Sequence, residues 1–446
     1  MLSRIPRGTW KMATAFRVAA VVLCLSTAPA GPLPTQPAPS RNNGLRRYCT
    51  WFTTCLDELE DNLPNIATTV EAAAQRYVSV PSCGIGASGE PGFVEEWYER
   101  AGGIMAVKRF EDIAKAPVPA VILHALREER IPQDMHGINA QRARGNFIVV
   151  FGRADLLQAA RDAGLAADAA VTLPAAHHGG LFPPSSPGGE ALVPTDPTAA
   201  VAALWVWTGE FIAACTRQGK MPPIFLSYEL DPSRVRAKRY AGKAFHDAVP
   251  RPIGAAVLGR EYLRRARQTF QQVTTEHAED LRTIAGMALD TLNRDHRLYT
   301  YAHGHAIQKH VGIRHDPGYF RQINTGWHRL IKDIELRPGD FVLCIGYNEI
   351  FRHTRHGRFA QKCRRQGISL AWSLAGYNER EIAAIQPGEP FVDQMWPRGD
   401  AVIALPGYDV SALPLSGLMS EAVFWMLNAE IHVRAARTGT VSERPL

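Results

Sequence analysis

The histidines of the second half of the chain could bind a metal ion. His303 and His305 are separated by one residue, and His353 and His356 by two, and both spacings are compatible with ligation. Neither spacing is diagnostic, and the chain contains no HExxH motif. Histidines that stand beside arginine and tyrosine in loops more often face solvent or bond to backbone groups. We therefore expect no metal site and no cofactor.

Two glutamates occupy equivalent places in the two halves. Trp205 stands five residues before Glu210, and Trp425 stands five residues before Glu430. A position that recurs in both halves favours a structural role. The tryptophans lie in apolar helical segments, so we expect them in the core rather than stacked on a sugar.

The first half alternates helix and strand patterns. Apolar residues recur at helical spacing over 46–77, and small residues at 84–88 predict a loop before a helix at 93–101. Further on we expect strands at 147–152 and 170–174, with helices at 156–164 and 199–216. Alternating strands and helices predict a parallel sheet.

The second half repeats this order. We expect a long helix at 262–293, strands at 298–302, 341–345, 368–372 and 401–405, a loop at 303–305 and a helix at 359–366. The shared order of strand, glycine loop, strand and closing helix indicates a tandem duplication. The strand at 401–405 is expected to match the one at 170–174.

The N-terminus has the order of a signal peptide. Basic residues precede an apolar run at 18–25, and Ala-Pro-Ala follows at 28–30. We predict a signal peptide over 1–30, a linker over 31–45, domains over 46–230 and 261–436, a connection over 231–260 and a disordered tail over 437–446. The alternatives are a start at Met12, an uncleaved anchor or a disordered N-terminal tail.

The composition and net charge of the chain indicate which kinds of partner it can have. The chain has 446 residues, of which 46% are hydrophobic and 21% charged, and this suits a globular body with real cores. Its net charge is +7, but the arginines are spread along the chain, so we do not expect nucleic-acid binding. No segment beyond the N-terminus predicts a membrane span.

Six cysteines follow the predicted signal without a CxxC pair, which leaves disulfides open and disfavours a zinc or thioredoxin motif.

Several motifs of the second half resemble one known family. Arg337 begins a Pro-Gly-Asp turn that leads into an apolar strand, 363–370 leads into another strand, 399–403 carries Asp-Ala-Val-Ile, and 414–422 opens the last helix. This pattern resembles the sugar isomerase (SIS) domain, closely over about the last 140 residues and more loosely over 77–226. The resemblance implies an α/β fold: two tandem three-layer α/β/α SIS-like domains with parallel, flavodoxin-like sheets.

The same resemblance implies a ligand site at the carboxyl ends of the strands. A phosphosugar would lie there, with its phosphate near backbone N–H groups at a helix start. The second half departs from the family's Ser/Thr-rich phosphate loop and carries Glu349 where a phosphate would be repelled. The positions we expect to contact the ligand are Gly84, Gly86, Ser88, Gly304, Tyr347, Asn348, Thr354 and Ser416.

Isomerisation of a sugar phosphate needs a base that moves a proton between adjacent carbons, and often a histidine that opens the ring. Glu421 and His305 are the candidates that this chain offers. A carboxylate near the start of the closing helix also complements the helix dipole, which is the alternative role of Glu421.

The leading expectation is SIS-type binding of a phosphorylated or anionic sugar derivative. The alternatives are an aldose–ketose sugar-phosphate isomerase and a secreted scaffold with a degenerate pocket. A cleaved signal would make the protein periplasmic or extracellular, and otherwise it would be cytoplasmic. SIS domains commonly pair, so a homo-oligomer or an internal pseudo-dimer is compatible with the resemblance.

Overall fold

The computed structural model describes residues 43–80, 82–115, 119–184, 189–230, 233–246, 251–325, 329–331, 334–346, 355–377, 382–408 and 410–439. All of them belong to one compact unit, Asn42–Leu446. The predicted signal peptide, most of the linker and most of the C-terminal tail lie outside the described residues.

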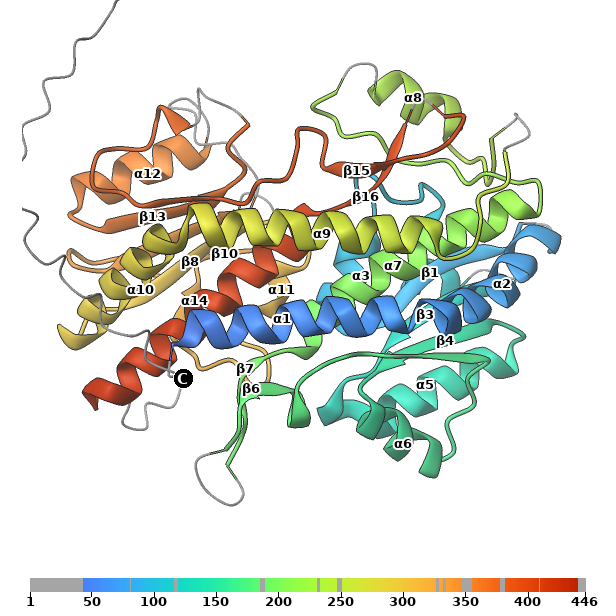
Figure 1. Ribbon diagram of the computed structural model, residues 1–446, viewed down its shortest axis with the longest axis horizontal. Helices are drawn as coiled ribbons and strands as arrows, with labels where there is room; N and C mark the ends of the chain where they lie inside the picture. Colours follow the sequence, from blue (N-terminus) through green and yellow to red (C-terminus); the bar gives the residue numbers. More distant parts are fainter. Residues whose placement is uncertain are drawn as a thin grey trace, which may run out of the picture. The chain divides into compact units, whose positions relative to one another are not determined.

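The first half contains a five-stranded parallel sheet (Figure 1). Its strand order is β2-β1-β3-β4-β5, and every adjacent pair is parallel. Both faces of the central strands are covered, which is why β3 and β4 are almost entirely apolar. The strands are β1 Gly84–Gly89, β2 Val107–Arg109, β3 Ala120–Ala125, β4 Phe147–Gly152 and β5 Ala169–Thr172.

The second half contains another five-stranded parallel sheet, with the order β14-β13-β12-β8-β9. In each sheet the first strand along the chain lies between the second and the third. This confirms the α/β class with parallel sheets, while the duplication itself stays a prediction. The strands are β8 Leu298–His303, β9 Phe320–Gln322, β12 Phe341–Gly346, β13 Ser369–Leu374 and β14 Phe391–Asp393.

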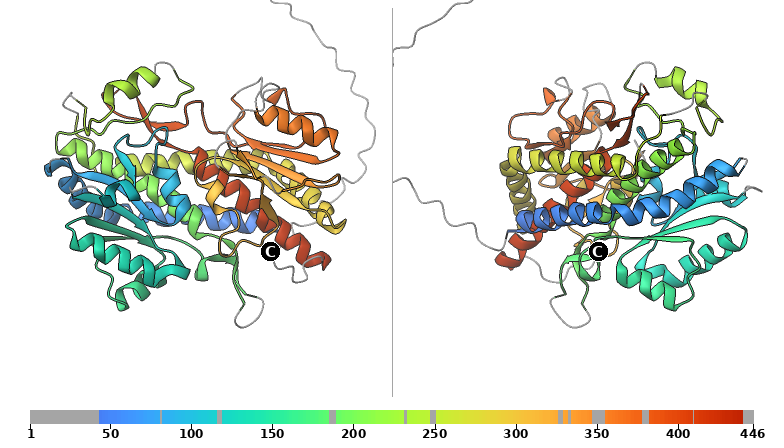
Figure 2. Two further views of the ribbon diagram at one scale, coloured as in Figure 1. Left: turned by 180° about the vertical axis from the view of Figure 1, so that it is seen from behind. Right: turned by 45° about the vertical axis from the view of Figure 1, so that its right-hand side comes forward.

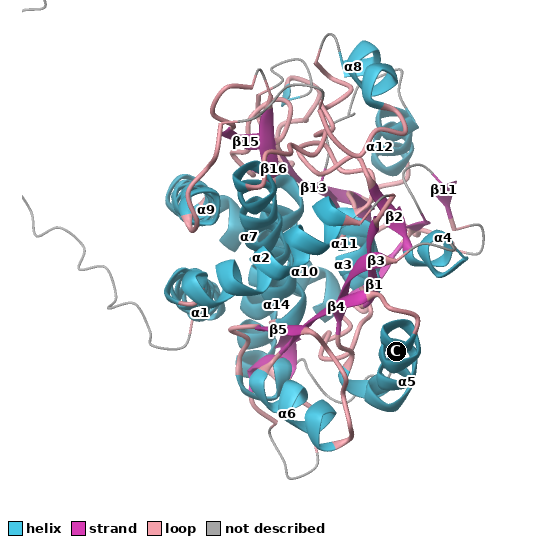
Figure 3. Cartoon of the chain, turned by 90° about the vertical axis from the view of Figure 1, so that its right-hand side faces the viewer, coloured by secondary structure: helices cyan, strands magenta, loops and turns pink. Residues whose placement is uncertain are grey.

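Helices cover both faces of the first sheet (Figure 3). Separate apolar clusters lie on its two faces, one shared with α4, α5 and α6 and the other with α2 and α7. The helices are α1 Gly44–Asp61, α2 Leu63–Ser79, α3 Pro91–Trp97, α4 Phe110–Lys115, α5 Ile131–Ala143, α6 Ala154–Asp162, α7 Asp196–Arg217, α8 Ser233–Tyr240, α9 Val257–Glu276, α10 Ala278–Asn293, α11 Ile307–His310, α12 Arg355–Arg365 and α14 Ser416–Thr438.

The closing helices α7 and α14 are the buried centre of the molecule. Both are apolar around most of their circumference, as expected of helices surrounded by protein. α7 packs against α2 and α9, and α14 packs against α1 and α10, so the N-terminal helix contacts the second half (Figure 2). By length and composition α7 could cross a membrane, but its apolar window is fully buried inside the protein.

One predicted strand is not part of the parallel sheet. β15, Ala401–Ala404, pairs antiparallel with β16, Ser411–Pro414, and β14 occupies the sheet edge instead. Gly399 and Asp400 both have left-handed backbone, with φ of 89° and 67°, and this turn separates β15 from the sheet. The predicted match between 401–405 and 170–174 is therefore wrong.

Two predicted helices are each divided in two. The segment 46–77 breaks at Asn62, and the new helix that begins at Leu63 carries Pro64 in its first turn, while 262–293 breaks at His277. The short antiparallel pairs β6 Gly180–Phe182 with β7 Leu192–Pro194, and β10 Asn324–Thr325 with β11 Arg329–Leu330, complete the described strands.

The cysteines of the described residues are free thiols. Burial raises the pKa of Cys83 to about 11 and that of Cys49 to about 12. These thiols are therefore protonated and unreactive at neutral pH, and the described structure contains no disulfide.

Candidate functional site

The strand order of the first sheet reverses between β1 and β3. At such a point the connections leave the sheet in opposite directions, and ligands of open parallel sheets bind in the crevice outside the carboxyl ends. Ser88 near the end of β1 and His124 near the end of β3 are partners in the parallel register. The fold thus brings a predicted ligand residue beside a histidine that sequence reasoning missed.

Ser88, His124 and Asp134 form a row of buried polar groups. Ser88 Oγ lies 2.9 Å from His124 Nδ1, and His124 Nε2 lies 3.5 Å from Asp134 Oδ2 on α5. The Arg127 backbone N–H donates to Asp134 Oδ2 at 3.0 Å, and its guanidinium contacts the same carboxylate. Burial alone would raise the pKa of Asp134, but the nearby His124 and the hydrogen bonds from Arg127 outweigh it and hold that pKa at about 2. Asp134 is therefore an anion that faces the imidazole.

Gly84 and Gly86, two of the glycines predicted to contact a ligand, lie within β1 rather than in a loop. A Cβ on Gly86 would lie 2.4 Å from Lys108 O of the neighbouring strand, so close pairing with β2 requires glycine there. A Cβ on Gly84 would come no closer than 3.2 Å to any neighbour, at Ala120 Cβ, so the space there is less restrictive. The turn after Ser88 is made by Gly89, whose φ is 93°.

The start of α3 already holds a carboxylate. Glu90 accepts hydrogen bonds from the backbone N–H groups of Gly92 at 2.9 Å and Phe93 at 2.6 Å. His310 Nε2 of the second half lies 2.9 Å from the same carboxylate. The place where the family resemblance puts a phosphate is thus filled by a side chain of the protein itself.

Glu421, a predicted catalytic residue, is fully buried in the second turn of α14. Its Oε1 lies 2.8 Å from His310 Nδ1, and its Oε2 accepts a hydrogen bond from Trp425 Nε1 at 2.8 Å. Burial by itself would lower the pKa of His310, but Glu421 and Glu90 raise it well above its usual value. His310 is therefore a buried imidazolium between two carboxylates, which joins α3 to α14.

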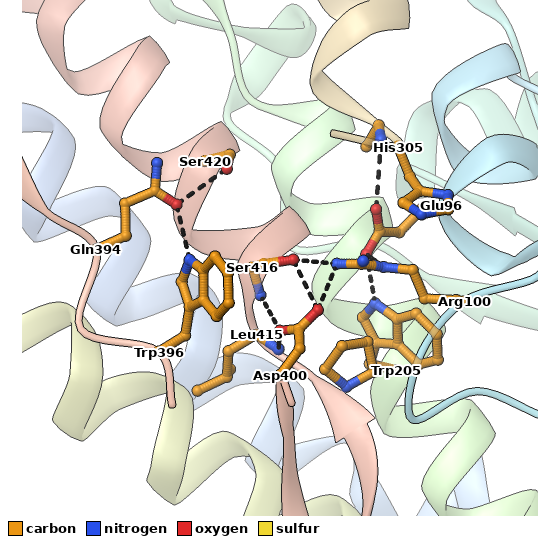
Figure 4. Close-up of polar contacts among 12 residues, drawn as sticks. Glu96, Arg100, Trp205, His305, Gln394, Trp396, Asp400, Leu415, Ser416 and Ser420 are labelled. Atoms are coloured by element: carbon orange, nitrogen blue, oxygen red, sulfur yellow. Dashed lines mark hydrogen bonds and ion pairs between the residues drawn. The ribbon is translucent and has the colours of Figure 1, made fainter. Parts of the chain in front are cut away.

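A second buried network connects the same elements (Figure 4). Arg100 Nε lies 3.1 Å from Glu96 Oε1, and its Nη2 lies 3.0 Å from Asp400 Oδ2. Ser416, predicted to contact a ligand, donates to Asp400 Oδ2 at 2.8 Å and also contacts Arg100. The described contacts of Ser416 are thus those of an internal charge network.

His305, the other predicted catalytic residue, lies against α3. Its Nδ1 is 3.0 Å from the backbone oxygen of Glu95, and the next residue, Ala306, donates its N–H to Glu96 Oε2 at 3.3 Å. Burial, with a further contribution from Arg100, lowers the pKa of His305 well below its usual value. Gly304 is buried beside it, whereas Tyr347, Asn348 and Thr354 lie outside the described residues.

A cavity of about 870 Å³ lies at the carboxyl ends of β4 and β5. Arg153 in its wall contacts three carboxylates: Asp155 at 3.0 Å, Glu128 at 3.0 Å and Asp196 at 2.5 Å. The lining residues are Glu58, Asp61, Asn62, Arg153, Ala154, Asp155, Thr172, Leu173, Pro174, Ala175, Ala176 and His178. Within the described part of the chain, no group of three or more His, Cys, Asp or Glu side chains is placed to hold a metal ion.

Comparison with known proteins finds likeness in fold only. No family model matches the sequence, and no curated protein matches it. Similar solved structures include the C-terminal domain of glucosamine-fructose-6-phosphate aminotransferase from Francisella tularensis, with 9% identity, TM-score 0.41 and coverage of 87% of this chain and 98% of that one. Tagatose-6-phosphate ketose/aldose isomerase from Escherichia coli has 9% identity, TM-score 0.44 and coverage of 89% and 93%.

Glucosamine-6-phosphate deaminase from Thermotoga maritima is also similar, with 8% identity, TM-score 0.37 and coverage of 87% of this chain and 95% of that one. In fold, the chain is similar to these proteins.

Proposed function

We propose that the chain binds a phosphorylated or otherwise anionic sugar derivative in the cavity at the carboxyl edge of the first sheet. The observation that carries the proposal is the position of the cavity at the ends of β4 and β5, with a volume of about 870 Å³. Open parallel sheets bind ligands at this edge, and small-molecule pockets commonly have volumes of ~300–1,000 Å³.

The lining suits the hydroxyl groups of a sugar. Glu58 and Asp61 supply carboxylate acceptors, Asn62 supplies a donor and an acceptor, and Thr172 supplies a hydroxyl. Sugar hydroxyls both donate and accept hydrogen bonds, so they match this mixture better than an apolar ligand would.

Arg153 and the first turn of α6 would receive the anionic group. Arg153 precedes Ala154, the first residue of α6, and both line the cavity. Positive charge and free N–H groups at a helix start favour an anion. Because three carboxylates already share Arg153, we expect a phosphate to strengthen binding of a sugar by less than about tenfold.

Isomerisation by Glu421 and His305 stays a prediction. Neither residue lines this cavity, and the Glu421 carboxylate is engaged with His310 and Trp425. Binding without isomerisation is therefore the function that the described contacts support. Export and assembly with a second copy also stay predictions.

Thermal shift and calorimetric titration of the full chain test the proposal. The ligands are hexose phosphates, amino-sugar phosphates, the parent sugars and inorganic phosphate. Asp61→Asn should weaken binding of the best ligand at least about fivefold because one hydroxyl acceptor loses its charge. Asp290→Asn, at an exposed helix position outside the cavity, is the matched control. No shift with any sugar, or equal binding by both variants, would contradict the proposal.

A further inference from the structure

The row formed by Ser88, His124 and Asp134 is not among the residues that line the cavity. We infer that Ser88 is a nucleophile that cleaves acyl esters, with His124 as its general base and Asp134 as a positioning residue. The nucleophile itself is argued from this geometry alone. The assignment of its substrate as an ester of a sugar derivative rests on the proposed function.

The proposed chemistry sets the proton positions. For Ser88 to act as nucleophile, its hydroxyl, whose Oγ lies 2.9 Å from His124 Nδ1, donates to that nitrogen, and the ring proton is then on Nε2. That Nε2–H faces Asp134 Oδ2 at 3.5 Å. This is the order of nucleophile, base and carboxylate that activates a serine, with the two ring nitrogens exchanged relative to the usual serine hydrolases.

The surroundings hold this geometry in place. Ser88, His124 and Asp134 are 8%, 6% and 2% exposed, so few waters compete for their hydrogen bonds. Parallel pairing of β1 with β3 fixes the first two residues, and Arg127 fixes the carboxylate from two sides. An ionised Asp134 stabilises the imidazolium that forms when the ring takes a proton.

The row lies at the same carboxyl edge of the first sheet as the proposed ligand. β3 pairs directly with β4, at whose carboxyl end Arg153 and Ala154 line the cavity. β1, which carries Ser88, is two strands from β4, and adjacent strands lie about 4.8 Å apart, so only a sugar derivative with an acyl chain spanning about 10 Å along the edge could reach Ser88 from the cavity.

In the first step Ser88 Oγ bonds to the ester carbonyl carbon while His124 Nδ1 takes the hydroxyl proton. The bond between that carbon and the alcohol oxygen then breaks, and the imidazolium gives its proton to the departing alcohol. Water attacks the acyl-serine, His124 takes one proton from it, and the proton returns to Ser88 as the carboxylic acid leaves.

Covalent labelling of the full chain with a fluorophosphonate tests the nucleophile without a sugar. Peptide mass spectrometry should place the adduct on Ser88, with labelling at least about a hundredfold faster than at Ser373, a buried strand serine that accepts a hydrogen bond from Gln394. His124→Gln should slow labelling about a hundredfold or more. With p-nitrophenyl acetate, Asp134→Asn should lower kcat with KM unchanged, a split that a purely structural role would not give.

The experiment distinguishes failure of the proposed nucleophile from failure of the proposed sugar binding. An adduct on Ser88 in a chain that binds no sugar would support the nucleophile and contradict the proposed function. Sugar binding by a folded chain whose Ser88 is not labelled would overturn the nucleophile and leave the proposed function standing. Because the adduct is located in the unaltered chain, this result does not depend on whether a variant folds.

Discussion

Glu90 and His310 lie 220 residues apart in the sequence, yet Glu90 Oε2 is 2.9 Å from His310 Nε2. The contact joins the start of α3 in the first half to α11 in the second. Because Glu421 Oε1 forms an ion pair with the other ring nitrogen, His310 connects three elements through a charge-assisted hydrogen bond and an ion pair. The same contact fills the start of α3, so a ligand of the first sheet must bind elsewhere along the carboxyl edge.

Replacing His310 by glutamine should destabilise the protein by about 3–5 kcal/mol, because the buried Glu421 and the partly buried Glu90 lose their shared cation. Urea unfolding at neutral pH measures this. His296→Gln is the control, since its ring is partly exposed and 4.0 Å from Asp340, and it should change stability by less than about 0.5 kcal/mol. Equal effects of the two changes would show that the His310 contact stabilises little.

The same histidine should make stability depend on pH. Its pKa is raised in the folded state, so its stabilising contribution is complete below the unfolded value near 6.5 and is lost as pH rises through the folded value. The free energy of unfolding should therefore fall above pH ~6.5 by up to about 1.4 kcal/mol per pH unit. Urea unfolding at several pH values should show this slope in the wild type and not in His310→Gln. Identical slopes would refute the assignment.

Asp134 should make stability depend on pH in the opposite sense to His310: its stabilising contribution is lost as the pH falls. Its pKa of about 2 lies below the ordinary value of 3.8, so its stabilising contribution is present above pH ~4 and is lost as pH falls toward 2. The full contribution is about 2 kcal/mol at neutral pH. Between pH 5 and 3 the melting temperature of the wild type should fall further than that of Asp134→Asn. Asp290→Asn should behave as the wild type does, and a parallel fall in all three chains would count against the pairing with His124 and Arg127.

Gly92→Ala should be strongly destabilising, because the new Cβ would lie 1.9 Å from His310 Nε2. Gly137→Ala is the matched control at a helix position where the new Cβ would have no other atom within 4 Å. It should leave stability unchanged or raise it by up to about 1 kcal/mol. Thermal unfolding of both variants checks the pair. A Gly92 variant as stable as the Gly137 variant would mean that α3 and α11 do not pack as described.

The apolar strands β4, β8 and β12 could be predicted because each is a buried run bounded by turn residues. The three-residue edge strands β2, β9 and β14 carry too few residues for such a pattern and become visible only through pairing. The 401–405 segment has the composition of a strand, but the left-handed turn at Gly399 and Asp400 gives it a different partner.

The contacts of the candidate site, like the edge strands, could be predicted from the sequence only in part. Ser88 was predicted from its place in a small-residue segment, but His124 stands inside an apolar strand, where a histidine looks like part of the core. Their contact depends on the register of β1 with β3, and the contact of His310 with Glu421 depends on how the two halves pack. Neither relationship follows from spacing along the chain.

The most direct test of the account is the position of a bound sugar derivative. Crystals of the full chain would be soaked with the sugar or sugar phosphate that gives the largest thermal shift. The account predicts ligand density in the cavity at the ends of β4 and β5, within hydrogen-bond distance of Asp61 or Thr172. Density at the carboxyl edge of the second sheet, with this cavity holding only solvent, would contradict it.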